Sequence, residues 1–170
     1  MAIFDAFLKL DGINGESADA KHKGEIDLVS FSWGATNPVS IGSATGGAGA
    51  GKLKFDDLRV VKKVDLSSPK LFQACATGQH ISTGTIVVRK AGGVQLEYLK
   101  LNLNLIFIKD IQQQGTPQGD EIPLEEITMA IGSLQFQYQQ QGSDGKAQGG
   151  PSIASWNVVT NNDNPTIPGL

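Results

Sequence analysis

The sequence predicts an all-β fold of barrel-like curved sheets, with one short α-helix and a long extended loop. Three observations lead to this fold class. Apolar and polar residues alternate in six or seven separate segments, which is the pattern of half-buried strands. A single segment carries both the start and the stop signals of a helix. In two of the longer strands the alternation slips by one residue, which indicates bulges that bend a sheet toward a barrel.

The predicted strands share this alternation and are separated by turn residues. The first slip of alternation falls at Asp56–Asp57 and the second at Gly132. In the longest strand the leucines continue in one parity through Leu105 and Phe107, so both are expected on the core face. The strands are expected at Ala2–Leu10, Ile26–Gly34, Lys52–Val64, Ile81–Ala91, Val94–Ile111, Ile122–Gln141 and Ser152–Thr160.

The helix is predicted within Ser67–Gly78. A serine precedes Pro69 at the helix start, and Gly78 stands where a left-handed residue ends a helix. Leu71, Phe72 and Cys75 are expected to form its apolar side, packed on the sheet.

A glycine-rich connection, Ala35–Gly51, joins the second and third predicted strands. Connections of this length are either functional or disordered. Its end, Gly46–Lys52, matches part of a phosphate-binding loop. However, Leu53 stands where the motif needs Ser or Thr, and a strand pattern follows instead of a helix. Nucleotide binding is therefore disfavoured against a role in contacting another molecule.

Composition and charge argue against several classes of protein. The net charge of −3 and the scattered lysines and arginines disfavour nucleic-acid binding. Cys75 is the single cysteine, so an internal disulfide is excluded. The first residues, with Asp5 among alternating apolar positions, do not resemble a signal peptide, and no segment has the length of a membrane span. The chain is therefore expected to be made in the cytoplasm and, if exported, to leave without a cleavable signal.

No set of residues predicts an active site, a metal site or a cofactor site. His22 and His80 lack the spacing to further ligands that a zinc site needs. The acidic pairs, such as Glu125/Glu126, lie on predicted strands whose alternate residues are apolar, so solvated faces explain them. Residues 1–160 are expected to form one domain, and the tail 161–170 is expected to be flexible because it lacks apolar periodicity.

Several strands carry a weakly charged polar face. Ser30 and Ser32 share one parity, and the longest strands place asparagines and glutamines opposite their leucines. Such faces suit ordinary solvent exposure, and they also suit the inner wall of a pore built from several subunits. The sequence leaves both interpretations open. The polar positions are Lys100, Asn102 and Asn104 on one strand, and Gln135, Gln137 and Gln139 on the next.

The chain resembles the hemolysin-coregulated protein (Hcp) family, which forms the tube of bacterial type VI secretion systems. The matching motifs run in family order over about 2–159. They are Gly15–Asp19 with His22 and Glu25–Asp27, Ser32–Gly34 with the glycine-rich loop, Pro69, Leu71, Ala74–Cys75 and Gly78–His80, Arg89–Gly93, Glu97–Leu99, and Gly149–Pro151 with Trp156.

This resemblance implies a non-enzymatic subunit of hexameric rings. The rings stack into a tube that a sheath propels, with a spike protein at its tip, and small effectors ride in the ring lumen, where Ser30 and Ser32 are candidate wall residues. The alternative is a β-barrel module that binds a small ligand or effector without forming a tube. By the resemblance, the extended loop contacts neighbouring subunits or stacked rings through Asn37, Pro38, Val39, Ile41, Gly42, Gly46, Gly47, Gly49 and Gly51.

Overall fold

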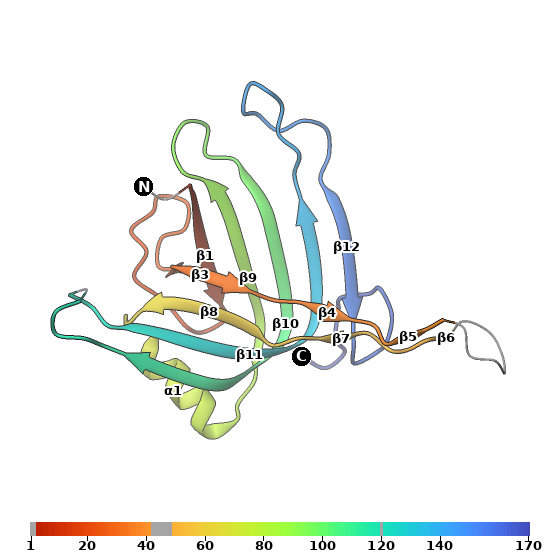
Figure 1. The fold of residues 1–170 in the computed structure, drawn as a ribbon, viewed down its shortest axis with the longest axis horizontal. Coiled ribbons are helices and arrows are strands. Elements are labelled where there is room, and N and C mark those ends of the chain that lie inside the picture. The colour runs from red at the N-terminus through yellow and green to blue at the C-terminus, as the bar shows by residue number, and fades with distance from the viewer. Residues whose placement is uncertain (1–2, 42–48, 120) are drawn as a thin grey trace.

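An eight-stranded antiparallel sheet contains most of the secondary structure in the computed structural model, which describes residues 3–41, 49–119 and 121–170. Its strand order is β2-β1-β9-β10-β11-β8-β3, and β12 pairs with β11 beside this path (Figure 1). The all-β, barrel-like fold class is confirmed. The strands of this sheet are β1 (Phe4–Leu10), β2 (Ile26–Leu28), β3 (Ser30–Ser32), β8 (Leu58–Lys63), β9 (Ile81–Lys90), β10 (Glu97–Gln114), β11 (Leu124–Tyr138) and β12 (Ser152–Asn157).

The strands at the two ends of this order, β2 and β3, follow one another directly in the sequence. The predicted strand Ile26–Gly34 is interrupted at Val29, so β2 pairs with β1 whereas β3 pairs with β8. At the interruption the Val29 amide donates to the Val61 carbonyl at 2.8 Å. The chain therefore changes partners within one residue and closes the sheet into a nearly complete barrel.

The long strands β10 and β11 belong to two walls of the barrel. Residues 97–106 of β10 pair with β9, and residues 133–138 of β11 pair with β12. The other half of β11, residues 124–129, pairs with β8. In Figure 1 both strands bend from the upright group into the lower wall that β8 and β3 complete.

Where β10 and β11 bend, the side chains that face the core switch from one alternate set of residues to the other. Leu105 has a positive φ of 54°, and beyond it Ile106 and Ile108 are buried whereas Phe107 is 38% exposed. The prediction that Leu105 and Phe107 continue the core face is therefore wrong. A Cβ on Gly132, the residue opposite this point, would lie 3.0 Å from the Leu105 Cβ, so glycine permits the close approach.

The predicted bulge at Gly132 is also corrected. The register is unchanged across it, with Asn104 opposite Ser133 and Ile106 opposite Ile131. In β10 and β11 the core-facing positions switch at the same place, so the register between the two strands is kept there. The register shift of this strand pair falls between Ile108 and Asp110 instead. At the other predicted slip, Asp56–Asp57, the strand is broken into β7 (Lys54–Phe55) and β8.

The barrel interior is a single apolar cluster to which every wall contributes. Leu8 of β1, Ile86 of β9, Leu103 of β10, Met129 of β11 and Leu58 of β8 are all at most 1% exposed. Helix α1 (Ser68–Thr77) adds Leu71 and Ala74 to this cluster.

Helix α1 has the predicted bounds and stop signal. Gly78 follows it in the left-handed conformation with φ 67°. Ser67 precedes it without forming a side-chain cap. Phe72, predicted on the apolar side, is 66% exposed, because Leu71, Ala74 and Cys75 provide the face that packs on the core.

A buried ion pair fixes the start of the helix to the sheet. The Lys62 ammonium lies 2.6 Å from the Glu125 carboxylate and 2.7 Å from that of Asp65, and the Lys62 and Glu125 side chains are at most 1% exposed. Ser68, in the first turn of α1, donates to Glu125 at 2.5 Å. Burial alone would raise the pKa of Glu125, but hydrogen bonds from Lys62, Ser68 and Gln113 hold that pKa below its usual range.

The tail 161–170, expected to be flexible, is packed against the sheet in the structure. The buried Asn157 side chain donates to the carbonyls of Asn164 and Thr166, both at 3.1 Å. Ile167 is 9% exposed and lies over Gly132. The sequence pattern misses this packing because single side chains, rather than a periodic face, hold the tail.

Candidate assembly surfaces

The glycine-rich connection forms a two-stranded arm that projects from the barrel (Figure 1). Its base is the pair β4 (Ala35–Thr36) and β7, and its outer part is the pair β5 (Val39–Ser40) and β6 (Gly49–Ala50). The described parts of this connection are thus paired as strands although they are rich in small residues, because backbone pairing needs no large side chains. The predicted positions Gly42, Gly46 and Gly47 lie outside the described residues.

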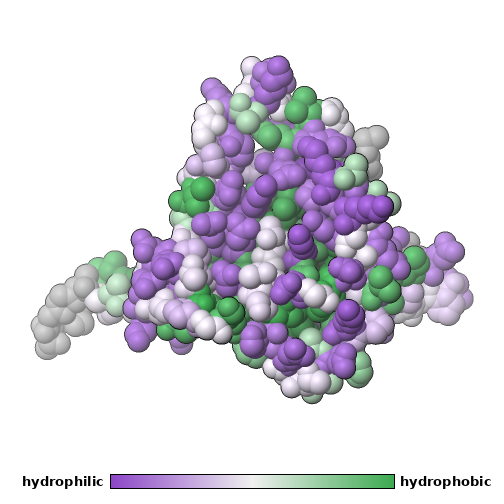
Figure 2. All heavy atoms as spheres, turned by 180° about the vertical axis from the view of Figure 1, so that it is seen from behind, coloured by the Kyte–Doolittle hydropathy of each residue, from purple (hydrophilic) through white to green (hydrophobic). Residues whose placement is uncertain are grey.

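The described arm residues expose apolar side chains. Val39 is 55% exposed and Ile41 is 86% exposed. Figure 2 shows hydrophobic atoms gathered on the arm next to the grey residues. Exposed apolar groups on a projecting element are typical of a surface that contacts another molecule.

The arm strands approach closely where Gly51 meets Pro38. The Gly51 amide donates to the Pro38 carbonyl at 3.0 Å, and a Cβ on Gly51 would lie 2.5 Å from the Pro38 Cγ. Asn37 and Gly51 also line a groove between the arm and Trp156 of β12. Gly49, by contrast, has open space at its Cβ position. Of the predicted arm glycines within the described ranges, Gly51 is the one that the backbone contact requires.

Ser30 and Ser32 lie on the outer face of the wall formed by β3, β8, and the lower halves of β11 and β10. Both serines are exposed, whereas Phe31 between them packs on the core. Ser30 is opposite Val61 and Ser32 is opposite Arg59. The two hydroxyls therefore share a solvent-facing side of the sheet.

The predicted amide face lies on a different wall. Asn102 accepts a hydrogen bond from Thr85 at 3.2 Å and donates one to Gln135 at 3.0 Å, which forms a polar row across β9, β10 and β11. Seen from behind, the upper part of the molecule, where these strands rise, is mostly hydrophilic (Figure 2). The serines and the amide row thus occupy separate parts of the sheet.

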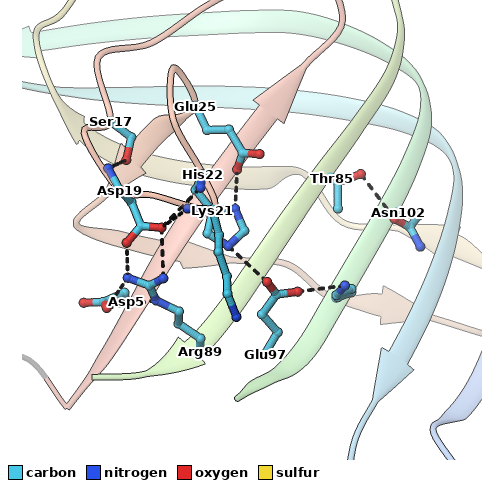
Figure 3. A network of polar contacts seen from close by, with 11 residues as sticks. Asp5, Ser17, Asp19, Lys21, His22, Glu25, Thr85, Arg89, Glu97 and Asn102 are labelled. Carbon is cyan, nitrogen blue, oxygen red and sulfur yellow. Dashed lines mark hydrogen bonds and ion pairs between the residues drawn. The ribbon is translucent and has the colours of Figure 1, made fainter. Parts of the chain in front are cut away.

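The polar loop 11–24 is held on the barrel by a network of charges (Figure 3). Arg89 is 4% exposed and donates to Asp5 at 3.1 Å and to Asp19 at 3.0 Å. The guanidinium also lies 4.8 Å from the centre of the Phe7 ring. Hydrogen bonds from Arg89 and from the Lys21 amide lower the pKa of Asp19 to about 2.

His22 belongs to the same network. Its ring stacks on Phe7 at 4.2 Å, Nδ1 lies 2.8 Å from Glu25, and Nε2 lies 3.3 Å from Glu97. Lys100 in turn pairs with Glu97 and, against the effect of burial, lowers the pKa of Glu97. The network fixes the loop to β1, β9 and β10, so the role of these charged residues is structural.

No cluster of potential metal ligands is found among the described residues. His80 packs against Phe107, with ring centres 5.9 Å apart. Lys52, in the partial phosphate-loop motif, leads into β7 rather than a helix. No helix in the described part of the chain is long and apolar enough to cross a membrane.

Comparison with known proteins gives one family. Residues 7–138 match the model described as type VI secretion system effector, Hcp. The chain is 37% identical to Protein hcp1 of Pseudomonas aeruginosa over 158 residues, which is 92% of this chain and 96% of that protein.

Solved structures agree with this match. A type six secretion system protein superposes with a TM-score of 0.88 at 33% identity, covering 95% of this chain and 99% of that one. Hcp1 from Salmonella typhimurium gives a TM-score of 0.80 at 30% identity, covering 96% and 100%. The chain therefore belongs to the Hcp family, the secreted structural proteins that form the tube of the type VI secretion system.

Proposed function

We propose that six copies of this chain form a ring, and that rings stack into a tube exported without a cleavable signal peptide. A sheath surrounds the tube, and a spike protein sits at its tip. The observation that carries this proposal is the arm, which projects from the barrel and exposes Val39 and Ile41 (Figure 1). Catalysis has no place in this proposal.

A ring of identical subunits requires two different complementary surfaces on each copy. The arm supplies one of them, because its strands are already paired and extend past the body of the molecule. A pre-ordered arm loses less conformational freedom on binding than a disordered loop would, which favours assembly. This argument assigns Asn37–Ile41 and Gly49–Gly51 to contacts between subunits.

Native mass spectrometry and electron microscopy of the purified protein test the ring. The expected result is a six-subunit particle with a central opening. Val39→Asp combined with Ile41→Asp is expected to reduce ring formation while leaving the circular dichroism of the subunit unchanged. Leu66→Asp combined with Val159→Asp, which adds the same two charges at side chains 62% and 57% exposed outside the arm, is the control. A strictly monomeric wild-type protein at high concentration would contradict the proposal.

We further propose that the wall bearing Ser30 and Ser32 lines the lumen, where small effectors bind. The support is its exposed outer face, on which the hydroxyls of Ser30 and Ser32 offer hydrogen-bonding groups. Ser32→Tyr is expected to reduce the amount of effector that co-purifies with the ring and to leave ring mass unchanged apart from the substitution. Ser152→Tyr, at an exposed serine of β12, is the control. If the amount of recovered effector is unchanged in Ser32→Tyr, this wall is not the surface that binds effectors in the lumen.

The alternative function is a small-ligand or effector-binding barrel without tube formation. Effector binding by a protein that stays monomeric, and is unaffected by arm substitutions, would favour it.

A further inference from the structure

An open apolar cleft lies at the start of β1, next to the point where the barrel closes. Its volume is about 570 Å³. Ile3 is 87% exposed, Phe4 is 43% exposed and Val29 is 55% exposed. These large side chains line it together with Asp5, Ala6, Phe7, Asp27 and Leu28.

The cleft exists because β2 leaves β1 early. Ala6 opposite Leu28 is the last pair of their ladder, and at Val29 the chain turns to β8. Within the described residues, no strand pairs with Ile3–Asp5 on this edge. The edge therefore offers free backbone hydrogen-bonding groups beside exposed apolar side chains, which is the combination that accepts an added strand.

The arm has matching properties. It exposes Val39 and Ile41, and its returning strand carries Lys52 and Lys54, both exposed. Asp27, also exposed, lies on the cleft rim. In the described part of the chain none of these three charges takes part in an ion pair, so they remain available to a partner.

We propose that this cleft receives the arm of a second copy of the chain. Val39 and Ile41 of one copy pack on Ile3, Phe4 and Val29 of the next. The arm backbone extends the free edge of β1, and Lys52 or Lys54 approaches Asp27. The inference rests on the proposed ring, because it names the surface that the arm contacts.

The placement of the two surfaces supports a heterologous contact between copies. In Figure 1 the arm leaves the barrel on one side, and the chain start that forms the cleft lies toward the other. A contact between two different sides of identical subunits is heterologous, and it propagates from copy to copy into a ring when the rotation between copies closes, or into an open filament when it does not.

Photo-crosslinking identifies the surface that the arm contacts. A benzophenone amino acid replaces Val39 in the full-length chain, the assembled protein is irradiated, and crosslinked peptides are identified by mass spectrometry. Crosslinks between copies to residues 3–7 or 27–29 are the expected result. Rings whose crosslinks map to another surface overturn the cleft assignment and leave the ring intact. Monomers without crosslinks between copies overturn both.

Charge reversal provides an independent measurement. Asp27→Lys is expected to reduce the ring fraction in native mass spectrometry at least several-fold at low salt, and either Lys52→Asp or Lys54→Asp in the same chain is expected to restore part of it. Glu16→Lys, at another exposed carboxylate, is the control. If Asp27→Lys assembles like wild type, or if neither Lys52→Asp nor Lys54→Asp restores any of the lost ring fraction, the proposed pairing is wrong.

Discussion

Replacing Lys62 by Met removes the positive charge that pairs with the Glu125 and Asp65 carboxylates at the start of α1, and it nearly keeps the side-chain volume. Lys62 is 0% exposed, and its ammonium donates to the Lys63 carbonyl at 2.8 Å and to Asp65 at 2.7 Å, in addition to its ion pair with Glu125. In Lys62→Met the Glu125 carboxylate stays buried with hydrogen bonds from Ser68 and Gln113 alone.

The magnitude follows from the burial of Glu125. Removing one partner of a buried ion pair costs about 3–5 kcal/mol, because the other charge remains buried without compensation. For a chain of this size, each kcal/mol lowers Tm by about 2–4 °C, so the expected loss is about 6–20 °C. Lys63→Met, at the exposed neighbouring lysine, is expected to change the free energy of unfolding by less than about 0.5 kcal/mol.

Urea unfolding at several pH values tests this reasoning. In the wild type the pKa of Glu125 is lowered, so its contribution is present at neutral pH and is lost as the pH falls below 4.5. In Lys62→Met burial dominates and raises the pKa of Glu125. The loss in free energy of unfolding relative to the wild type is therefore expected to shrink as the pH falls from 7 toward 5. Lys62→Met combined with Glu125→Gln is expected to regain part of the loss. A Lys62→Met protein as stable as Lys63→Met at pH 7 would refute the argument.

Three further predictions concern backbone contacts and the charge network. Gly51→Ala places a Cβ 2.5 Å from Pro38, so the arm must shift; native mass spectrometry is expected to show fewer rings with an unchanged circular dichroism spectrum, whereas Gly49→Ala has open space and assembles normally. Gly132→Ala places a Cβ 2.9 Å from Ile167 and 3.0 Å from Leu105, and is expected to cost about 1–3 kcal/mol in urea unfolding, with Gly150→Ala unchanged. Because the pKa of Asp19 is lowered from 3.8 to about 2, its stabilisation is present above pH 3.8 and is lost between that value and about 2. The protection factors of the amides in residues 11–24, which are exchange rates corrected for intrinsic exchange at each pH, are expected to fall over this interval. Equal protection factors at pH 4.5 and pH 2 would contradict this prediction.

The fold class was predictable because strand alternation is a local property. The segments around Leu8, Ile86 and Ile127 follow it, and their apolar positions are core positions in the structure. The stop of the helix at Gly78 was equally local, since a left-handed residue there needs no distant partner.

The structure shows contacts that the sequence pattern does not predict where a distant residue decides the conformation. Leu105 reverses the core side because Gly132, on the neighbouring strand, leaves room for it. The tail is held by isolated side-chain contacts: Asn104 and Ser133 both donate to the Pro165 carbonyl, and Asn157 donates to two further carbonyls of the tail. Neither interaction has a signature within a window of consecutive residues.

The assembly surfaces were predictable in part. The long glycine-rich segment marked the arm, and the shared parity of Ser30 and Ser32 marked an outward face. The cleft beside Val29 was not predictable, because it exists only where β2 changes partners, and the sequence there reads as one unbroken strand.

The change of partners at Val29 also bears on the order in which the chain folds. The segment Ile26–Ser32 binds β1 on one side and β8 on the other, so it gains its full set of hydrogen bonds only after both strands are in place. Forming contacts on both sides at once requires closing long loops, which is slow and costs chain entropy. This short segment is therefore expected to join the sheet late in folding and to be the element that closes the barrel. Its release would open the barrel and, at the same time, free the base of the arm.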